Sequence, residues 1–112
     1  MIDDPRVEVT RVGRFSAEPS AVSSTYSESF RTLERTIQSV NPEALVAPYL
    51  VVVVTDSRYY ASLTNNVFRF LPIRLTSRDL ERMHGTNERI SVANYERAIR
   101  TYHQLLINTS SR

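Results

Sequence analysis

The 112-residue sequence contains no cysteine, no lysine and no tryptophan, and its only glycines are Gly13 and Gly85. Without cysteine, the chain has no disulfide framework, no thiolate metal ligand and no cysteine nucleophile. Two isolated glycines also exclude a glycine-rich phosphate-binding loop and a nucleophile elbow of the Gly-x-Ser-x-Gly type. Several common enzyme classes are therefore excluded before any motif is considered.

Long apolar runs are missing as well. The longest, residues 44–54, is interrupted by Pro48 and is too short to span a bilayer, so no membrane segment is predicted. The first residues, Met-Ile-Asp-Asp-Pro, have neither the basic region nor the apolar region of a signal peptide. We therefore expect a cytoplasmic location, provided that Met1 is the natural N-terminus.

The basic residues are all arginine, and they are mixed with acids. Fourteen arginines and twelve carboxylates give a formal net charge of +2. Arginines and acids alternate closely along residues 28–35 and 78–82. This pattern is typical of solvated helix faces with local ion pairs, and it favours them over a nucleic-acid-binding surface. A basic binder of nucleic acid or anions is therefore the least favoured of three hypotheses.

The pattern of apolar residues predicts an α/β fold in the order strand, helix, strand, helix, strand, helix, helix. Strands are predicted at 6–12 and 67–71, where polar and apolar side chains alternate. A further strand is predicted at 45–55, a β-branched apolar run without alternation, which is typical of a strand buried on both faces. This run forms the spine of the predicted sheet.

Apolar stripes at helical spacing predict amphipathic helices over residues 25–40 and 91–106. Between them, a short helix is predicted after a cap at Asp56 or Ser57. Another is predicted over 76–83, opened by a capping box of the Thr-x-x-Asp type. These helices are expected to cover the sheet.

The chain has two histidines, His84 and His103, nineteen positions apart. A self-contained zinc site needs three or four ligands, so composition alone predicts no metal site. Two polar segments, 55–58 and 83–89, nevertheless lie where chemistry could occur. Polar residues after a buried strand often bind ligands, but both segments are also explained as helix caps. His103 is expected to be a surface or boundary residue.

Three motifs occur together: Thr-Asp-Ser-Arg at 55–58, Arg-Phe-Leu-Pro at 69–72, and His-Gly-Thr-Asn-Glu-Arg at 84–89. In this order and spacing they resemble the C-terminal third of zinc-dependent amidohydrolases of the aminoacylase and carboxypeptidase-S type. The similarity runs through nearly the whole chain.

The resemblance also implies a division of the chain. Residues 1–13 resemble the end of the family's inserted lid domain, and residues 14–24 are expected to be a linker. Residues 25–112 are similar to the C-terminal portion of the catalytic domain.

The resemblance implies hydrolysis of N-acyl amino acids or short peptides with two zinc ions as cofactors. His84 stands where the family has its last zinc ligand. Thr55 stands where the family seats the carboxylate or carbonyl of the substrate. Asn87 and Glu88 are similar to the segment that supports the zinc ligand.

The chain departs from the family in two respects. The other metal ligands and the general-base glutamate have no counterpart here, and one histidine cannot hold a catalytic zinc. Val53 and Val54 replace the small residues usual before Thr55, where glycine allows close approach of a ligand. We therefore expect that the chain alone binds no zinc and is catalytically silent.

Two further hypotheses concern partners. In the first, the chain is a fragment whose partner is the missing N-terminal catalytic half. In the second, it is a stand-alone structural or interaction module that forms a homo-oligomer, because uncovered apolar faces promote association.

Overall fold

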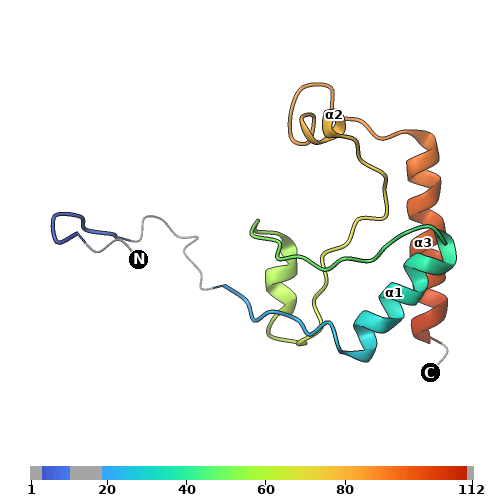
Figure 1. Ribbon diagram of the computed structural model, residues 1–112, viewed down its shortest axis with the longest axis horizontal. Helices are drawn as coiled ribbons and strands as arrows, with labels where there is room; N and C mark the ends of the chain where they lie inside the picture. Colours follow the sequence, from blue (N-terminus) through green and yellow to red (C-terminus); the bar gives the residue numbers. More distant parts are fainter. Residues whose placement is uncertain (1–3, 11–18, 111–112) are drawn as a thin grey trace.

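The computed structural model describes residues 4–10 and 19–110, and its regular elements are helices (Figure 1). In chain order they are α1 (Glu28–Val40), the 3-10 helix η1 (Asp56–Tyr60), α2 (Ser77–Leu80) and α3 (Val92–Ser110). Within those described ranges no residue is in a β-strand. The predicted α/β fold is therefore wrong, and the structure is helical with long irregular connections.

The three predicted strands fail for a common reason. None of residues 6–10, 45–55 and 67–71 is in a β-strand, while residues 11 and 12 lie outside the described part of the chain. A strand exists only when its backbone groups bond to a neighbouring strand, whatever its side chains favour. No described segment supplies such a ladder to residues 45–55.

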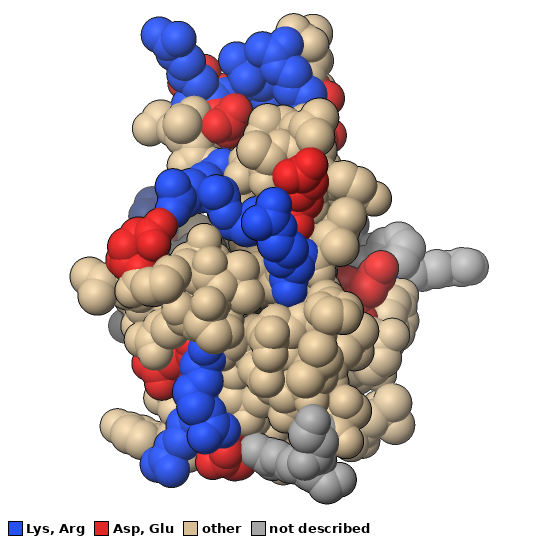
Figure 2. Space-filling view, turned by 90° about the vertical axis from the view of Figure 1, so that its right-hand side faces the viewer, with Lys and Arg blue, Asp and Glu red and all other residues tan. Residues whose placement is uncertain are grey.

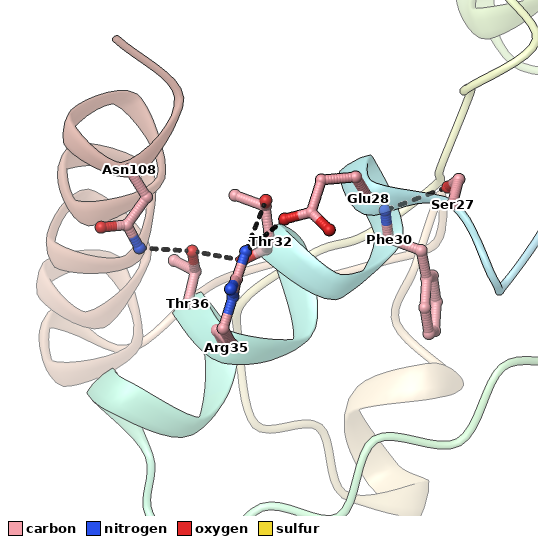
Figure 3. A network of polar contacts seen from close by, with 7 residues as sticks. All are labelled: Ser27, Glu28, Phe30, Thr32, Arg35, Thr36 and Asn108. Atoms are coloured by element: carbon pink, nitrogen blue, oxygen red, sulfur yellow. Dashed lines mark hydrogen bonds and ion pairs between the residues drawn. The ribbon is translucent and has the colours of Figure 1, made fainter. Parts of the chain in front are cut away.

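The two long helices predicted over 25–40 and 91–106 are confirmed, although α1 begins three residues later, at Glu28, and α3 continues to Ser110. α1 begins after Ser27, whose Oγ accepts a hydrogen bond from the backbone N–H of Phe30 at 3.2 Å (Figure 3). α3 follows Ser91, whose Oγ accepts from the N–H of Asn94 at 3.2 Å. Each side chain satisfies one N–H that the first helical turn leaves without a partner.

α1 packs against α3, and the buried side chains of this pair are mainly polar. Thr36 and Thr101 are almost fully buried, with Ile37 beside them. The Nδ2 of Asn108 on α3 donates to the Oγ1 of Thr36 on α1 at 2.8 Å (Figure 3). Thr36 in turn donates to the backbone carbonyl of Thr32 at 2.7 Å. The helix pair is therefore joined by hydroxyl and amide groups as much as by apolar contact.

Residues 67–72 lie beside the helix pair without forming a regular element. Ser23 Oγ donates to the carbonyl of Val67 at 3.0 Å and accepts from its N–H at 2.9 Å. The rings of Phe68 and Phe30 lie 5.5 Å apart between centroids, and the hydroxyl of Tyr102 donates to the backbone of the same segment at 3.2 Å. These contacts hold the segment that carries the Arg-Phe-Leu-Pro motif.

The chain exposes much more surface than a compact protein of its length. Its accessible area is 9948 Å², against about 6,300 Å² for a compact monomer of this mass. Its radius of gyration is 18.0 Å, against roughly 13 Å for a compact domain. We call residues 45–54 the apolar segment. In it, Leu45 is 96% exposed and Val52 86% exposed, so a large apolar surface lies open to solvent.

No helix in the described ranges is both long and apolar enough to cross a membrane. The predicted division at residues 1–13, 14–24 and 25–112 stays a prediction, because much of its first two parts lies outside the described residues.

Candidate functional site

The loop that follows α2 carries His84 in a conformation unusual for an L-residue. His84 has φ 58° and Asn87 has φ 66°, both in the left-handed region. Histidine and asparagine are among the few non-glycine residues found there, at a cost of about 1–2 kcal/mol each. Backbone strain of this kind clusters at functional sites, where the surrounding structure maintains it. His84 is exposed to solvent.

Gly85 closes a tight turn just after the end of α2. Its N–H donates to the carbonyl of Arg82 at 2.9 Å. A Cβ placed on Gly85 would lie 3.3 Å from the backbone oxygen of Glu81, tighter than an ordinary contact. The glycine after His84 therefore has a packing reason, which the sequence alone did not indicate.

Next to this loop is a shallow hollow of about 360 Å³. Glu88 is part of its lining, together with Asp79 and Arg82, whereas His84 and Asn87 are not. The remaining lining is mostly apolar and comprises Leu71, Ile73, Leu75, Met83, Arg89 and Ile90. Asn87 and Glu88 were predicted to support His84, and of these two Glu88 is the one that lines the hollow.

α2 opens with the predicted capping box. The carboxylate of Asp79 accepts from the backbone N–H of Thr76 at 2.8 Å and from its hydroxyl at 2.6 Å. Arg82 Nη1 lies 3.4 Å from the same carboxylate. The Thr76 hydroxyl, then its backbone N–H, and then the charges of Arg82 and Arg89 hold the pKa of Asp79 below its usual 3.8.

We expect the α2 turn to loosen in acid. Because the pKa of Asp79 is lower in the folded chain than in the unfolded chain, ionised Asp79 stabilises the α2 turn. This stabilisation is complete above pH 3.8 and is lost as the pH falls below that value through the folded pKa. Amide hydrogen exchange at Thr76 should therefore quicken, relative to the intrinsic rate, in that range. The variant Asp79→Asn should lack this pH dependence, and an unchanged dependence in the variant would contradict the assignment.

A second group of polar side chains surrounds Thr55. Thr55 is the N-cap of η1, so the predicted cap at Asp56 or Ser57 was wrong by one or two positions. The Oγ1 of Thr55 lies 2.6 Å from the Oγ of Ser57. The Nε of Arg69 donates to both oxygens, at 3.1 Å to Thr55 and 2.8 Å to Ser57.

Arg69 was not predicted as a site residue. It belongs to the Arg-Phe-Leu-Pro motif, and the structure brings this motif onto the Thr-Asp-Ser-Arg motif. In the sequence, the one indication of a role for Arg69 was that the two motifs occur together. Their co-occurrence did not show that they are in contact. Val53 and Val54, which precede Thr55, are 62% and 75% exposed and pack little against the chain.

Thr55 and His84 are not brought together. In Figure 1, η1 (yellow-green) and the loop after α2 (orange) lie in separate parts of the molecule. Within residues 4–10 and 19–110, no group of three or more histidines or carboxylates could hold a metal ion. These residues therefore do not by themselves fit a zinc site.

The chain is similar in sequence, over nearly its whole length, to proteins named as carboxypeptidase S-like and as N-fatty-acyl-amino acid synthase/hydrolase. The predicted resemblance to the C-terminal part of this family is confirmed. No family model matches the chain, and no solved structure matches it.

Three relatives illustrate the similarity. "Probable carboxypeptidase S-like 2" of Dictyostelium discoideum is 41% identical over 109 residues, 97% of this chain and 21% of the relative. The "N-fatty-acyl-amino acid synthase/hydrolase PM20D1" of Xenopus tropicalis is 38% identical over 98% of this chain and 21% of its own length. That of Homo sapiens is 34% identical over 99% of this chain and 22% of its own length. The chain thus spans about a fifth of the length of these curated relatives.

Proposed function

We propose that the chain supplies the C-terminal segment of a dizinc amidohydrolase that cleaves N-acyl amino acids or short peptides, and that it is catalytically inactive alone. The observation that carries this proposal is the sequence similarity over 97% of the chain to a carboxypeptidase-S-like relative, of which the chain spans 21%. The names of the relatives, which refer to a carboxypeptidase and to N-fatty-acyl-amino acids, support this substrate class.

In this proposal His84 is one zinc ligand, with Asn87 and Glu88 supporting its loop. The left-handed backbone at His84 and Asn87 supports a functional role for the loop. His84 is exposed to solvent, which is consistent with a ligand whose site is completed by another polypeptide. The remaining ligands and the general base come from the partner, because a catalytic zinc needs at least three protein ligands. Zinc, when bound, lowers the pKa of its water and polarises the scissile carbonyl.

The proposed partner is the missing N-terminal catalytic half. The apolar segment supports this choice, since Leu45 and Val52 have almost no cover from their own chain. The chain exposes about 3,600 Å² more than a compact monomer of its mass. A stable interface needs only about 800 Å² per partner.

Reconstitution tests the proposal. The chain is mixed, in the presence of zinc, with the residues that precede the matched segment in the 41% identical Dictyostelium relative. Hydrolysis of a panel of N-acyl amino acids is then followed by release of the free amino acid. Activity is expected from the mixture and from neither part alone. Zinc-dependent hydrolysis by the chain alone would contradict its inactivity, and a stable but inactive complex would contradict the assigned role.

The same exposed surface supports a second candidate, a homo-oligomeric interaction module. In it, a further copy of the chain covers the apolar segment, and no catalysis follows.

Nucleic-acid binding has less support, because many arginines lie beside acids. On the face in Figure 2, each group of blue side chains has red side chains beside it, and most of the remaining surface is uncharged. Such pairing weakens the positive field that phosphates require. The ion pairs among the described residues include Arg6–Asp4, Arg35–Glu28, Arg74–Glu43, Arg82–Asp79 and Arg100–Glu96.

A further inference from the structure

The side chain of Asn94, in the first turn of α3, binds the backbone of a residue twenty positions earlier in the chain. Its Oδ1 accepts from the backbone N–H of Arg74 at 3.0 Å, and its Nδ2 donates to the carbonyl of Arg74 at 2.8 Å. Because a backbone N–H only donates and a carbonyl only accepts, these two partners fix the orientation of the amide. Asn94 therefore binds both backbone groups of Arg74, as one residue of a neighbouring strand does.

This pair ties together the two ends of one loop. Residues 75–93, here called the 75–93 loop, lie between the paired residues and include α2 and the turn at His84. The residues that line the hollow beside α2 also belong to this loop, with the exception of Leu71 and Ile73. The paired residues therefore close the loop that carries the proposed zinc ligand.

The base of the 75–93 loop is also held by charged side chains from both long helices. The guanidinium of Arg74 pairs with Glu43, which lies just after the end of α1. Arg97, one turn further along α3, donates from Nη1 to the Oδ1 of Asn94 at 3.2 Å. This oxygen thus accepts two hydrogen bonds, which fill both of its acceptor positions. The amide of Asn94 is consequently held in place by α3 while it binds Arg74.

The closed loop contains the two residues in the left-handed region. His84 has φ 58° and Asn87 has φ 66°. Backbone of this kind persists only where the surrounding structure maintains it. Fixing the two ends of a loop reduces the number of conformations open to the residues between them, and so reduces the entropy that any one conformation loses. The contact between Asn94 and Arg74 supplies such a restriction.

We propose that Asn94 is a positioning residue, which closes the 75–93 loop on α3 and so presents His84 in its left-handed conformation before any partner binds. That His84 then meets zinc rests on the proposed function. A ligand whose loop is ordered in advance binds more tightly, because less conformational entropy is lost on binding. Asn94 acts through the backbone of Arg74 and not as a ligand.

The test follows the ¹⁵N-labelled isolated chain by NMR. A residue with positive φ holds its amide proton close to its own Hα, so His84 and Asn87 should each give a strong intraresidue NOE. Asn94→Leu keeps the size of the side chain and favours the helix, but it removes both hydrogen-bonding groups. In this variant both NOEs should weaken. Hydrogen exchange at the Arg74 amide should quicken at least about fivefold, the effect of losing hydrogen bonds that water partly replaces.

Two control variants separate the loss of this pair from other effects of substitution. Arg74→Ala removes the guanidinium but keeps the backbone groups that Asn94 binds, so both NOEs should remain. Asn108→Leu removes an amide farther along α3, which donates to Thr36 at 2.8 Å, and it should also leave both NOEs unchanged. Far-UV circular dichroism of each variant checks that the helices are retained.

The reconstituted enzyme gives a second measurement. Asn94→Leu should raise the zinc concentration for half-maximal hydrolysis about five- to tenfold, because a smaller fraction of the chain has the loop closed. The rate at saturating zinc should stay within about twofold, since zinc binding restores the closed loop. This combination is expected of a residue that orders a ligand, whereas loss of the ligand itself lowers the rate at saturating zinc.

Unchanged NOEs in Asn94→Leu would overturn the proposal, as would their loss in either control variant or their absence from the unmodified chain. A fall in the rate at saturating zinc as large as that of His84→Ala would also overturn it. The NMR measurement needs neither zinc nor a partner. Failure of the reconstituted hydrolysis therefore remains distinguishable from failure of the role of Asn94.

Discussion

Replacing His84 by alanine should reduce amide hydrolysis by the reconstituted enzyme at least about 100-fold, because under the proposed function a catalytic zinc would lose one of its few protein ligands. The only other histidine offers a matched control. His103 is exposed in the second half of α3, so His103→Ala should change the rate less than about twofold. Rates are compared at saturating zinc, with the zinc content of each complex measured by elemental analysis.

A second variant separates metal binding from backbone strain. Asparagine tolerates the left-handed conformation found at His84, so His84→Asn should preserve the loop while changing the metal-binding group. Its activity should fall as far as that of His84→Ala. Retention of full zinc content and more than a tenth of the activity in both variants would remove His84 from the metal site.

The double variant Val52→Asp and Val54→Asp should convert a homo-oligomer of the isolated chain into a monomer. These side chains are highly exposed in the apolar segment, so contact with another copy would bury them. A carboxylate at each position would then lose its hydration without gaining a partner, which strongly disfavours association. Light scattering at micromolar concentration should give a multiple of the chain mass for the unmodified chain and a single mass for the variant.

The control for this measurement lies outside the apolar segment. Val22 is 79% exposed, so Val22→Asp adds a comparable charge at a different apolar position and should leave the assembly unchanged. A monomeric unmodified chain at the same concentration would contradict the homo-oligomer. It would leave the N-terminal half as the partner that covers the apolar segment.

The helices could be predicted from the sequence because their determinants are local. An apolar stripe and a capping serine within a few residues define the start of α1, and Ser91 does the same for α3. The Thr76–Asp79 capping box likewise marks the start of α2, although that helix ends at Leu80. Such signals depend only on residues within a turn or two.

The strands could not be predicted, since a strand depends on partners distant in the sequence. The β-branched residues of the apolar segment favour an extended backbone, and this preference alone indicated a buried strand. The described residues provide neither a neighbouring strand nor cover for these side chains. The preference of these residues for an extended backbone was therefore wrongly taken as evidence for a buried strand.

In the candidate site, too, features with local determinants could be predicted and features that depend on distant residues could not. His84 and Thr55 were selected by their motifs, and their proposed roles stay predictions. The left-handed backbone at His84 and the contact of Arg69 with Thr55 required coordinates, because fourteen positions separate these two residues. A motif gives the order of residues along the chain but not the direction of the hydrogen bonds between them.

The buried threonines between α1 and α3 have a thermodynamic consequence. The most deeply buried side chains, Thr36 and Thr101, present a hydroxyl and one methyl group, and among the described residues Ile37 is the one large apolar side chain that is buried. Unfolding this pair therefore hydrates little new apolar area. Both the heat-capacity increment and the denaturant dependence of unfolding scale with that area, so both should be small for a chain of this length. The melting of the isolated chain should accordingly be broad, and a partner that covers the apolar segment should sharpen it.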